Sequence, residues 1–200
     1  GSATYASIAA SHFAPVRLVG VVGRDWPEDA TAMLAGRRVD TTGLEVDAGG
    51  DTFHWEGRYS ADLSSRETLA TDLNVFARFK PKIPAPFRAS RWVMLGNIHP
   101  VLQREVLEQI ERRPDLVVAD TMNHWIDEAP KELRRLMSRV DGMIVNDGEA
   151  RQLTGQHLTV AAGKEIMKMG LKILVIKKGE HGALLFYNHE VFAIPAYPLE

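Results

Sequence analysis

Residues 116–145 read LVVADTMNHWIDEAPKELRRLMSRVDGMIV, and this stretch decides the expected fold class. It begins with the apolar run LVVA and ends with the apolar run MIV, each of a length typical of a buried strand. Between the two runs, apolar residues recur at helical spacing and predict a helix over 131–140: Leu133, Leu136, Met137 and Val140. Short apolar strands joined by a helix indicate a parallel sheet in an α/β fold.

The same alternation continues on both sides of this stretch. Further strands are predicted at 16–22, 92–95, 172–177, 183–187 and 190–194. Further helices are predicted from Pro100 onward and at 148–153 and 160–169. The last three strands follow one another too closely for crossovers, so we expect an antiparallel meander there. The predicted architecture is a mainly parallel sheet with helices on both faces.

The first part of the chain is different in character. Asp25 is expected to cap a helix that has Pro27 in its first turn. Residues 40–60 contain aromatic residues interrupted by glycines, which suggests short twisted strands or a hairpin. Residues 80–88 (KPKIPAPFR) contain too many prolines for a helix.

Composition excludes several classes of function. The chain has 24 Lys and Arg residues against 26 Asp and Glu residues, and this balance argues against a nucleic-acid-binding protein. No cysteine is present, which excludes disulfides, thiolate zinc sites and cysteine nucleophiles in these 200 residues. No apolar run approaches the ~20 residues that span a bilayer, and the first residues do not resemble a signal peptide. We therefore expect a cytoplasmic protein without a membrane partner.

Polar residues follow the predicted strands at their carboxyl ends, where open α/β sheets bind ligands. Asn97 follows one strand, and Asp120 and Asn123 follow the next. Each of these residues could contact a substrate or form a local Asx turn, and the spacing does not decide between the two.

Two further strand ends also have two readings. Residues 146–149 (NDGE) form a capping box if Asn146 and Glu149 satisfy each other's backbone, and Glu149 could also hold a hydrated Mg²⁺. Residues 177–182 (KKGEHG) are either a hairpin turn that needs glycine or a loop whose lysines meet phosphate. Motifs for a P-loop, a dinucleotide fingerprint, a nucleophile elbow and a histidine zinc site are absent.

Taken in order, several segments resemble the PfkB/ribokinase family of carbohydrate and nucleoside kinases. They are GSATYAS at 1–7, VGVVGRD at 19–25, VDTTGL at 39–44, DTMNHW at 120–125, NDGE at 146–149 and VIKKGEHGA at 175–183. The resemblance spans the whole chain and implies a ribokinase-like fold with a small β lid, to which residues of about 44–60 contribute.

The resemblance also implies a chemistry, namely transfer of a phosphoryl group from ATP to a hydroxyl of a sugar or a sugar-like acceptor, with Mg²⁺ as cofactor. The implied acceptor contacts are Gly1, Asn97, Asp120 and Asn123. The implied nucleotide contacts are Asn146, Lys177, Lys178, Gly179 and Gly182, and the implied metal ligand is Glu149. A nucleoside kinase, or a silent module that binds sugar or nucleotide without turnover, is the alternative.

One family motif is not found in this sequence. The Gly-Ala-Gly-Asp segment, which carries the catalytic base in the family, is expected after residues 194–198. We therefore expect a partial domain over 1–200, inactive on its own, with its base beyond Glu200. The lid either closes over its own site or pairs with a second lid in a homodimer.

Overall fold

The computed structural model describes residues 1–60 and 66–198, and the chain divides into two compact units, Gly1–Arg88 and Ala89–Glu200.

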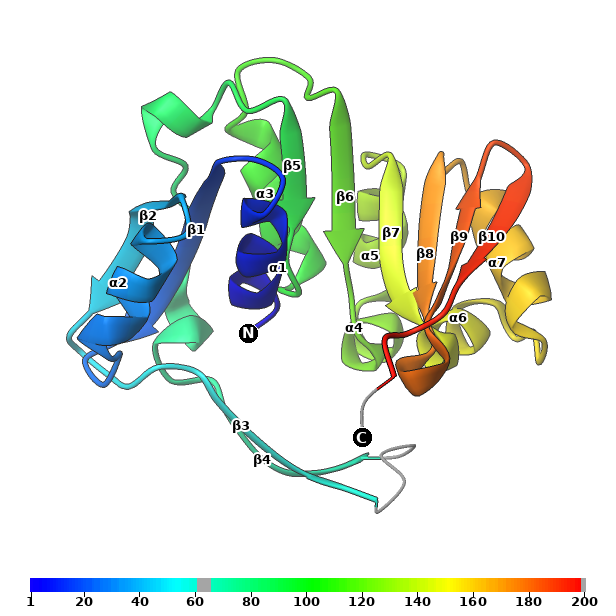
Figure 1. Ribbon diagram of the computed structural model, residues 1–200, viewed down its shortest axis with the longest axis horizontal. Helices are drawn as coiled ribbons and strands as arrows, with labels where there is room; N and C mark the ends of the chain where they lie inside the picture. The colour runs from blue at the N-terminus through cyan, green and yellow to red at the C-terminus, as the bar shows by residue number, and fades with distance from the viewer. Residues whose placement is uncertain (61–65, 199–200) are drawn as a thin grey trace. The chain divides into compact units, whose positions relative to one another are not determined.

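The first unit is built around two parallel strands (Figure 1). Helix α1 (Ser2–Ser11), strand β1 (Val16–Gly23), helix α2 (Glu28–Ala35) and strand β2 (Val39–Asp47) follow one another, and β1 pairs with β2 from Val16 opposite Val39. Parallel strands need such a crossover helix. Leu18, Leu34 and Val39 form the small core between strands and helices. The predicted strand at 16–22 is confirmed.

The other face of this strand pair is covered by irregular chain. It contains two short 3₁₀ helices, η1 (Asn74–Arg78) and η2 (Ala85–Phe87). The guanidinium of Arg17 lies 5.4 Å from the ring centre of Phe87, which also packs close to Gly43. Apart from the single turn of η2, residues 80–88 are non-helical as their prolines predict.

The expected role of Asp25 as a helix cap is wrong. Helix α2 has Pro27 as its N-cap residue, and the Asp25 carboxylate instead accepts hydrogen bonds from both the amide and the hydroxyl of Thr52, each at 2.7 Å. The Thr52 hydroxyl in turn accepts from the amide of Gly23 at 2.9 Å. These bonds hold the Thr52 segment against the end of β1, and the two Thr52 donors lower the pKa of Asp25.

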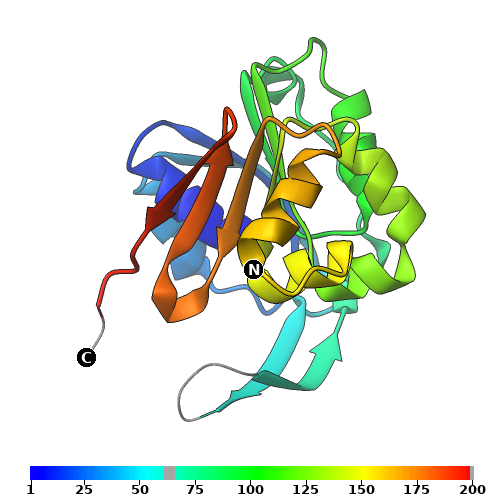
Figure 2. The same ribbon diagram turned by 90° about the vertical axis from the view of Figure 1, so that its right-hand side faces the viewer.

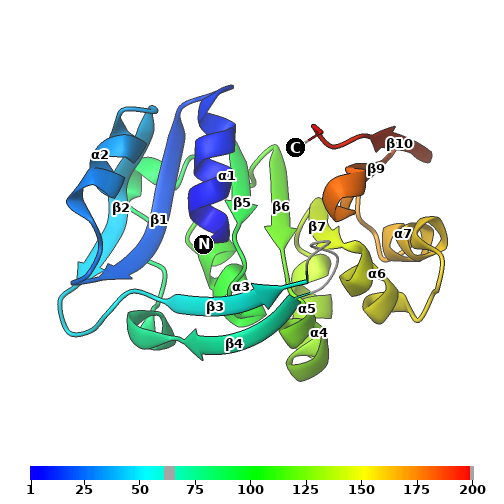
Figure 3. The same cartoon turned by 60° about the horizontal axis from the view of Figure 1, so that its bottom comes forward.

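Strands β3 (His54–Tyr59) and β4 (Arg66–Asp72) form a separate antiparallel ribbon, shown in Figure 3. Glu56 pairs with Ala70 while Gly57 pairs with Thr68, so Leu69 is the extra residue of a β-bulge. Of the range proposed for a lid, residues 44–47 belong to β2, and residues 54–59 form one strand of this ribbon. Residues 61–65 lie outside the described chain.

The second unit contains a six-stranded sheet in the order β10-β9-β8-β7-β6-β5. Its strands are β5 (Trp92–Leu95), β6 (Leu116–Asp120), β7 (Gly142–Asn146), β8 (Ile173–Lys177), β9 (Ala183–Tyr187) and β10 (Glu190–Ile194). Strands β5 to β8 are parallel, whereas β8, β9 and β10 are antiparallel neighbours. The predicted α/β class, mainly parallel sheet and terminal meander are confirmed.

The helices of this unit connect consecutive parallel strands. They are α3 (Pro100–Glu108), α4 (Asn123–Glu128), α5 (Pro130–Met137), α6 (Asp147–Thr154) and α7 (Thr159–Met167). Right-handed crossovers between strands that are added in one direction place their helices on one face, as Figure 2 shows. The main core lies between this face and the helices, with Val117, Met143 and Leu174 inaccessible to solvent.

At the amino ends of these strands, a buried carboxylate joins three elements. Asp141 accepts a hydrogen bond from the amide of Val117 at 2.9 Å and forms ion pairs with Arg113 at 3.0 Å and Lys172 at 2.9 Å.

Within the described chain, no helix is both long enough and apolar enough to cross a bilayer.

Candidate active site

The four parallel strands of the second unit end at the same edge of the sheet. Asp120 ends β6, Asn146 ends β7 and Lys177 ends β8, and Asn146 pairs directly with Lys177. Asn97 follows β5 by two residues. The polar residues that the sequence predicts at strand ends therefore do lie along one edge.

Strand alternation also places three of these side chains on one face. Ala119, Val145 and Ile176 are fully buried in the core beneath the helices. Asp120, Asn146 and Lys177 each come one residue later, so their side chains leave the opposite face of the sheet.

Asp120 is a buried titratable group at this edge, and its pKa is raised. The residue is 8% exposed, and its Oδ1 lies 3.8 Å from the Nζ of Lys177. Within the described chain, this buried Oδ1 accepts no hydrogen bond, and the hydroxyl of the neighbouring Thr121 is likewise buried without a partner. Burial raises the pKa of Asp120, and the positive charge of Lys177 opposes that rise only in part.

Asn146 and Glu149 form a complete capping box at the start of α6. The Oδ1 of Asn146 accepts from the amide of Glu149, and the Oε2 of Glu149 accepts from the amide of Asn146, both at 2.7 Å. The structural reading of the NDGE segment is confirmed. Glu149 is 5% exposed, which is unusual for a carboxylate and places its charge against the strand end.

Asn97 belongs to a cluster of aromatic rings that the sequence did not reveal. The indole N–H of Trp125 donates to the Oδ1 of Asn97 at 3.0 Å. The rings of His99 and His124 stand edge-on to the Trp125 ring, with ring centres 5.0 and 4.6 Å from its centre. Trp125 is predicted as a core or rim residue, and the histidines as structural or surface residues. Asn123 begins α4, where it is exposed.

The turn after β8 connects two antiparallel strands, as its structural reading predicts. Gly179 and Gly182 have φ angles of +57° and +85°, in the region that favours glycine. A Cβ on Gly182 would overlap the backbone of residues 194–196, whereas one on Gly179 would meet open space. The amide of Lys178 donates to the carbonyl of Gly182 at 2.7 Å and closes the turn.

The remaining predicted residue, Gly1, lies in the first unit, where it is the N-cap residue of α1.

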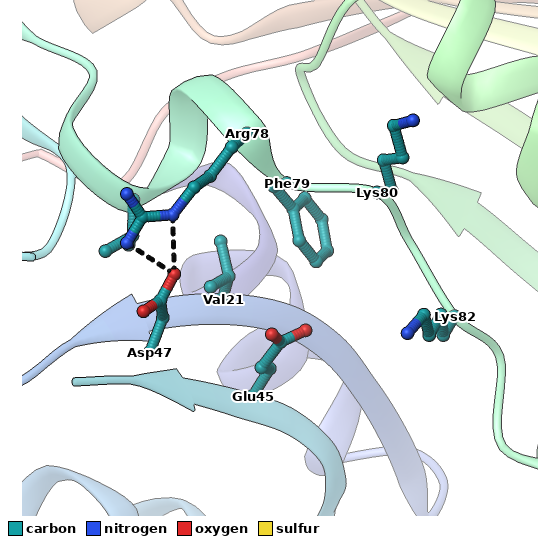
Figure 4. Close-up of a pocket in the computed structure, with 8 residues that line it drawn as sticks. Val21, Glu45, Asp47, Arg78, Phe79, Lys80 and Lys82 are labelled. Carbon is teal, nitrogen blue, oxygen red and sulfur yellow. Dashed lines mark hydrogen bonds and ion pairs between the residues drawn. The ribbon is translucent and has the colours of Figure 1, made fainter. Parts of the chain in front are cut away.

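The first unit also has a cavity of about 220 Å³, lined by Val21, Glu45, Asp47, Val75, Arg78, Phe79, Lys80 and Lys82. Figure 4 shows Arg78 reaching from η1 onto Asp47, with its Nη2 at 2.8 Å from the carboxylate. None of the predicted site residues lines this cavity.

The donor atoms at the strand edge fit a hydrated Mg²⁺ rather than a fully protein-coordinated metal. In the described residues, no three His, Asp or Glu side chains come together as a metal cluster. Magnesium usually keeps several waters and takes one or two carboxylates together with substrate phosphates. Glu149 and Asp120, whose Oδ1 accepts no hydrogen bond within the described chain, provide carboxylate oxygens of that kind.

Comparison with known proteins identifies relatives along the whole chain. The chain is 27% identical over 205 residues to the cytidine kinase of Thermococcus kodakarensis, and it covers 70% of that protein. Among solved structures, a protein from E. coli described as a ribokinase II, in complex with ATP and Mg²⁺, superimposes with a TM-score of 0.80. It is 16% identical, and the match covers all of this chain and 68% of the E. coli chain.

A nucleoside kinase from Burkholderia thailandensis in complex with inosine has a TM-score of 0.77 and 16% identity, and the match covers all of this chain and 65% of that enzyme. At such identities the two structures show the fold alone, and they confirm the predicted ribokinase-like architecture. The family assignment comes from the sequence, because residues 1–200 match the sequence pattern of the family described as "pfkB family carbohydrate kinase". The chain thus belongs to the pfkB family of carbohydrate kinases.

Proposed function

We propose that this protein transfers the γ-phosphoryl group of ATP to a hydroxyl of a ribosyl-containing acceptor. The observation that supports this most directly is the edge of the second unit, where the Asp120–Lys177 pair lies on strands adjacent to the Asn146–Glu149 capping box. Phosphoryl transfer depends on positioning and on neutralising phosphate charge, and the protein itself does little covalent chemistry. A strand edge with fixed cations and carboxylates suits both tasks.

The nucleotide side of the reaction is assigned to β7, β8 and the turn that follows. Lys177 and Lys178 would offset phosphate charge, and the backbone at Gly179 and Gly182 would allow close approach of the nucleotide. Asn146 would contact the nucleotide at the start of α6. Mg²⁺, when bound, would neutralise phosphate charge, and Glu149 would hold it through water.

The acceptor contacts of the second unit are assigned to Asn97, Asp120 and Asn123, and Gly1 of the first unit is assigned to the acceptor on the family resemblance alone. Trp125 donates to the Oδ1 of Asn97 and so fixes the orientation of that amide. We assign no general base within residues 1–200, since the Gly-Ala-Gly-Asp motif is not part of this sequence.

The choice of a ribosyl acceptor rests on the relatives. Cytidine, inosine and aminoimidazole riboside, which are named for three relatives, all contain ribose, and further neighbours are called ribokinases. Free ribose and ribonucleosides therefore remain the two alternatives. A silent module that binds the same ligands without turnover is the third.

The test uses the intact protein with ATP, Mg²⁺ and a panel of ribose, cytidine, inosine and a hexose. ADP release is measured beside the thermal shift that each compound produces. We expect turnover with at least one ribosyl compound and none with the hexose. Thermal shifts without ADP release would identify a silent module, and turnover with the hexose alone would contradict the ribosyl assignment.

A further inference from the structure

The side chain of Gln103 joins the ends of two strands of the candidate site. It is located one turn into α3 and is 1% exposed. Its Nε2 donates to the carbonyls of Gly96 and Asp120, both at 2.9 Å, and lies 3.3 Å from the carbonyl of Leu95. One buried amide thus contacts β5 and β6 at once.

These carbonyls lie where the ladder between the two strands ends. The last paired residues of β5 and β6 are Leu95 and Ala119, so Gly96 and Asp120 come one residue beyond the ladder. A buried carbonyl without a ladder partner needs another donor. Gln103 supplies that donor from beneath the sheet and limits how far the two strands can diverge.

The other end of the same amide indicates why a glutamine stands here. In the described chain, the Oε1 of Gln103 is buried and has no hydrogen-bond partner. A methionine would fill nearly the same space without leaving a buried acceptor unsatisfied. The amide therefore contributes through its donors to the two strand ends.

We propose that Gln103 is a positioning residue for the phosphoryl acceptor, an inference that rests on the proposed function. Asn97 directly follows the clamped Gly96, and Asp120 is clamped through its own carbonyl. By fixing the distance between these two backbone positions, Gln103 sets the spacing of two side chains assigned to the acceptor. The nucleotide-side residues on β7 and β8 receive no hydrogen bond from it among those that the structure describes.

The test compares Gln103→Met with Asp141→Asn in the intact protein. Asp141 is equally buried, but it lies at the amino ends of the strands, so its variant controls for lost stability. For Gln103→Met we expect kcat/KM for the acceptor to fall on the order of 10²-fold, the effect of a displacement of about 1 Å. The Kd for ATP should stay within about twofold of wild type. The buried carboxyl of Gln103→Glu would be protonated and would keep one donor. Its kcat/KM for the acceptor should therefore lie between those of the wild type and Gln103→Met.

A second readout does not depend on turnover. In Gln103→Met, hydrogen exchange should accelerate at the amides of residues 96–97 and 121–122 relative to residues 142–146. If the wild-type protein turns over no acceptor, the proposed function fails, and this exchange pattern alone decides whether the clamp exists. Equal losses of acceptor and ATP affinity, or exchange that is unchanged at both strand ends, would overturn the positioning role.

Discussion

Lys177 places its Nζ 3.8 Å from the Oδ1 of Asp120, although the two residues end strands that are separated by β7. The pair therefore spans the edge of the sheet above Asn146. Lys177 is half-exposed, whereas the Asp120 side chain is largely buried. The charged form of the Asp120 carboxylate is therefore destabilised, because burial penalises that form more than the charge of Lys177 compensates.

We predict that Asp120→Asn stabilises the protein at neutral pH while it lowers kinase activity. Because the folded state raises the pKa of Asp120, the folded protein binds more protons than the unfolded chain between the unfolded pKa of about 3.9 and the folded value. Wild-type stability therefore decreases as pH rises through that window and stays lower above it. The asparagine variant lacks this loss. Melting temperatures of both proteins from pH 3 to 8 test this predicted stabilisation, and a lower melting temperature for the variant at pH 7 would contradict it.

A second prediction concerns the effect of Lys177 on the pKa of Asp120. Lys177→Met should raise the pKa of Asp120 further, since it removes the positive charge that opposes the effect of burial on that pKa. Lys178→Met is the matched control, because it removes the adjacent charge and leaves the 3.8 Å contact intact. A carboxyl ¹³C titration of Asp120 in the three proteins measures the difference. Equal effects of the two lysine variants would show that the contact does not govern the pKa.

Glu149 allows capping and charge to be separated. A glutamine can accept the same hydrogen bond from the amide of Asn146, so Glu149→Gln should keep the melting temperature close to wild type. Its loss of charge should shift the Mg²⁺ concentration needed for activity upward more than it changes acceptor KM. Asn146→Ala should instead cost about 1 kcal/mol of stability as a lost cap.

Mg²⁺-titrated activity beside thermal unfolding distinguishes these two effects. If Glu149→Gln unfolds earlier and shows an unchanged Mg²⁺ response, Glu149 has only its structural role.

Two glycines of one turn should differ sharply on substitution. Gly179→Ala places a side chain in open space and should cost about 1–2 kcal/mol for its left-handed backbone. Gly182→Ala meets in addition the backbone of residues 194–196, so its loss of stability should be clearly larger. Urea unfolding of both variants measures this, and equal losses of stability would mean that the backbone of residues 194–196 moves away freely.

The strand pattern allowed most of the second unit to be predicted. Apolar runs such as those at β6, β7 and β8 are buried on at least one face, and their polar successors lie at one edge because parallel strands end together. The predicted helix over 131–140 is shorter than expected: α5 ends at Met137, and Val140 is buried in the following loop. Periodicity alone does not distinguish a last helical turn from a buried loop residue.

What the sequence could not reveal depends on contacts between distant segments. Asp25 has the residue type and position of a helix cap, but Thr52, 27 residues away, offers it two donors. Gln103 lies on the sheet-facing side of α3, where an amide within an otherwise apolar stripe was the available signal. The ring cluster around Trp125 joins residues 97–99, which precede α3, to residues 124–125 in α4, which no local pattern reports.

The β3–β4 ribbon leads to the last prediction, which concerns assembly. A two-stranded sheet is marginal in water unless a partner covers it. The rings of Trp55 and Tyr59 stand edge-on to each other on one face of β3, with their centres 6.5 Å apart, while Phe53 packs against Phe76. Tyr59 is 50% exposed and the bulge residue Leu69 is 44% exposed, so apolar surface remains on the ribbon.

We predict that this ribbon pairs with its counterpart in a homodimer of the intact protein, through the face that carries Trp55. Trp55→Glu should convert the dimer to a monomer, because it places a charge at the centre of the contact. His54→Glu is the control, since it introduces the same side chain at the adjacent position, which strand alternation places on the opposite face. Light scattering at tens of micromolar measures the mass of each protein. A wild-type monomer at that concentration would rule out the dimer and leave a lid that closes only over its own active site, in which case Trp55→Glu should raise acceptor KM without changing the mass.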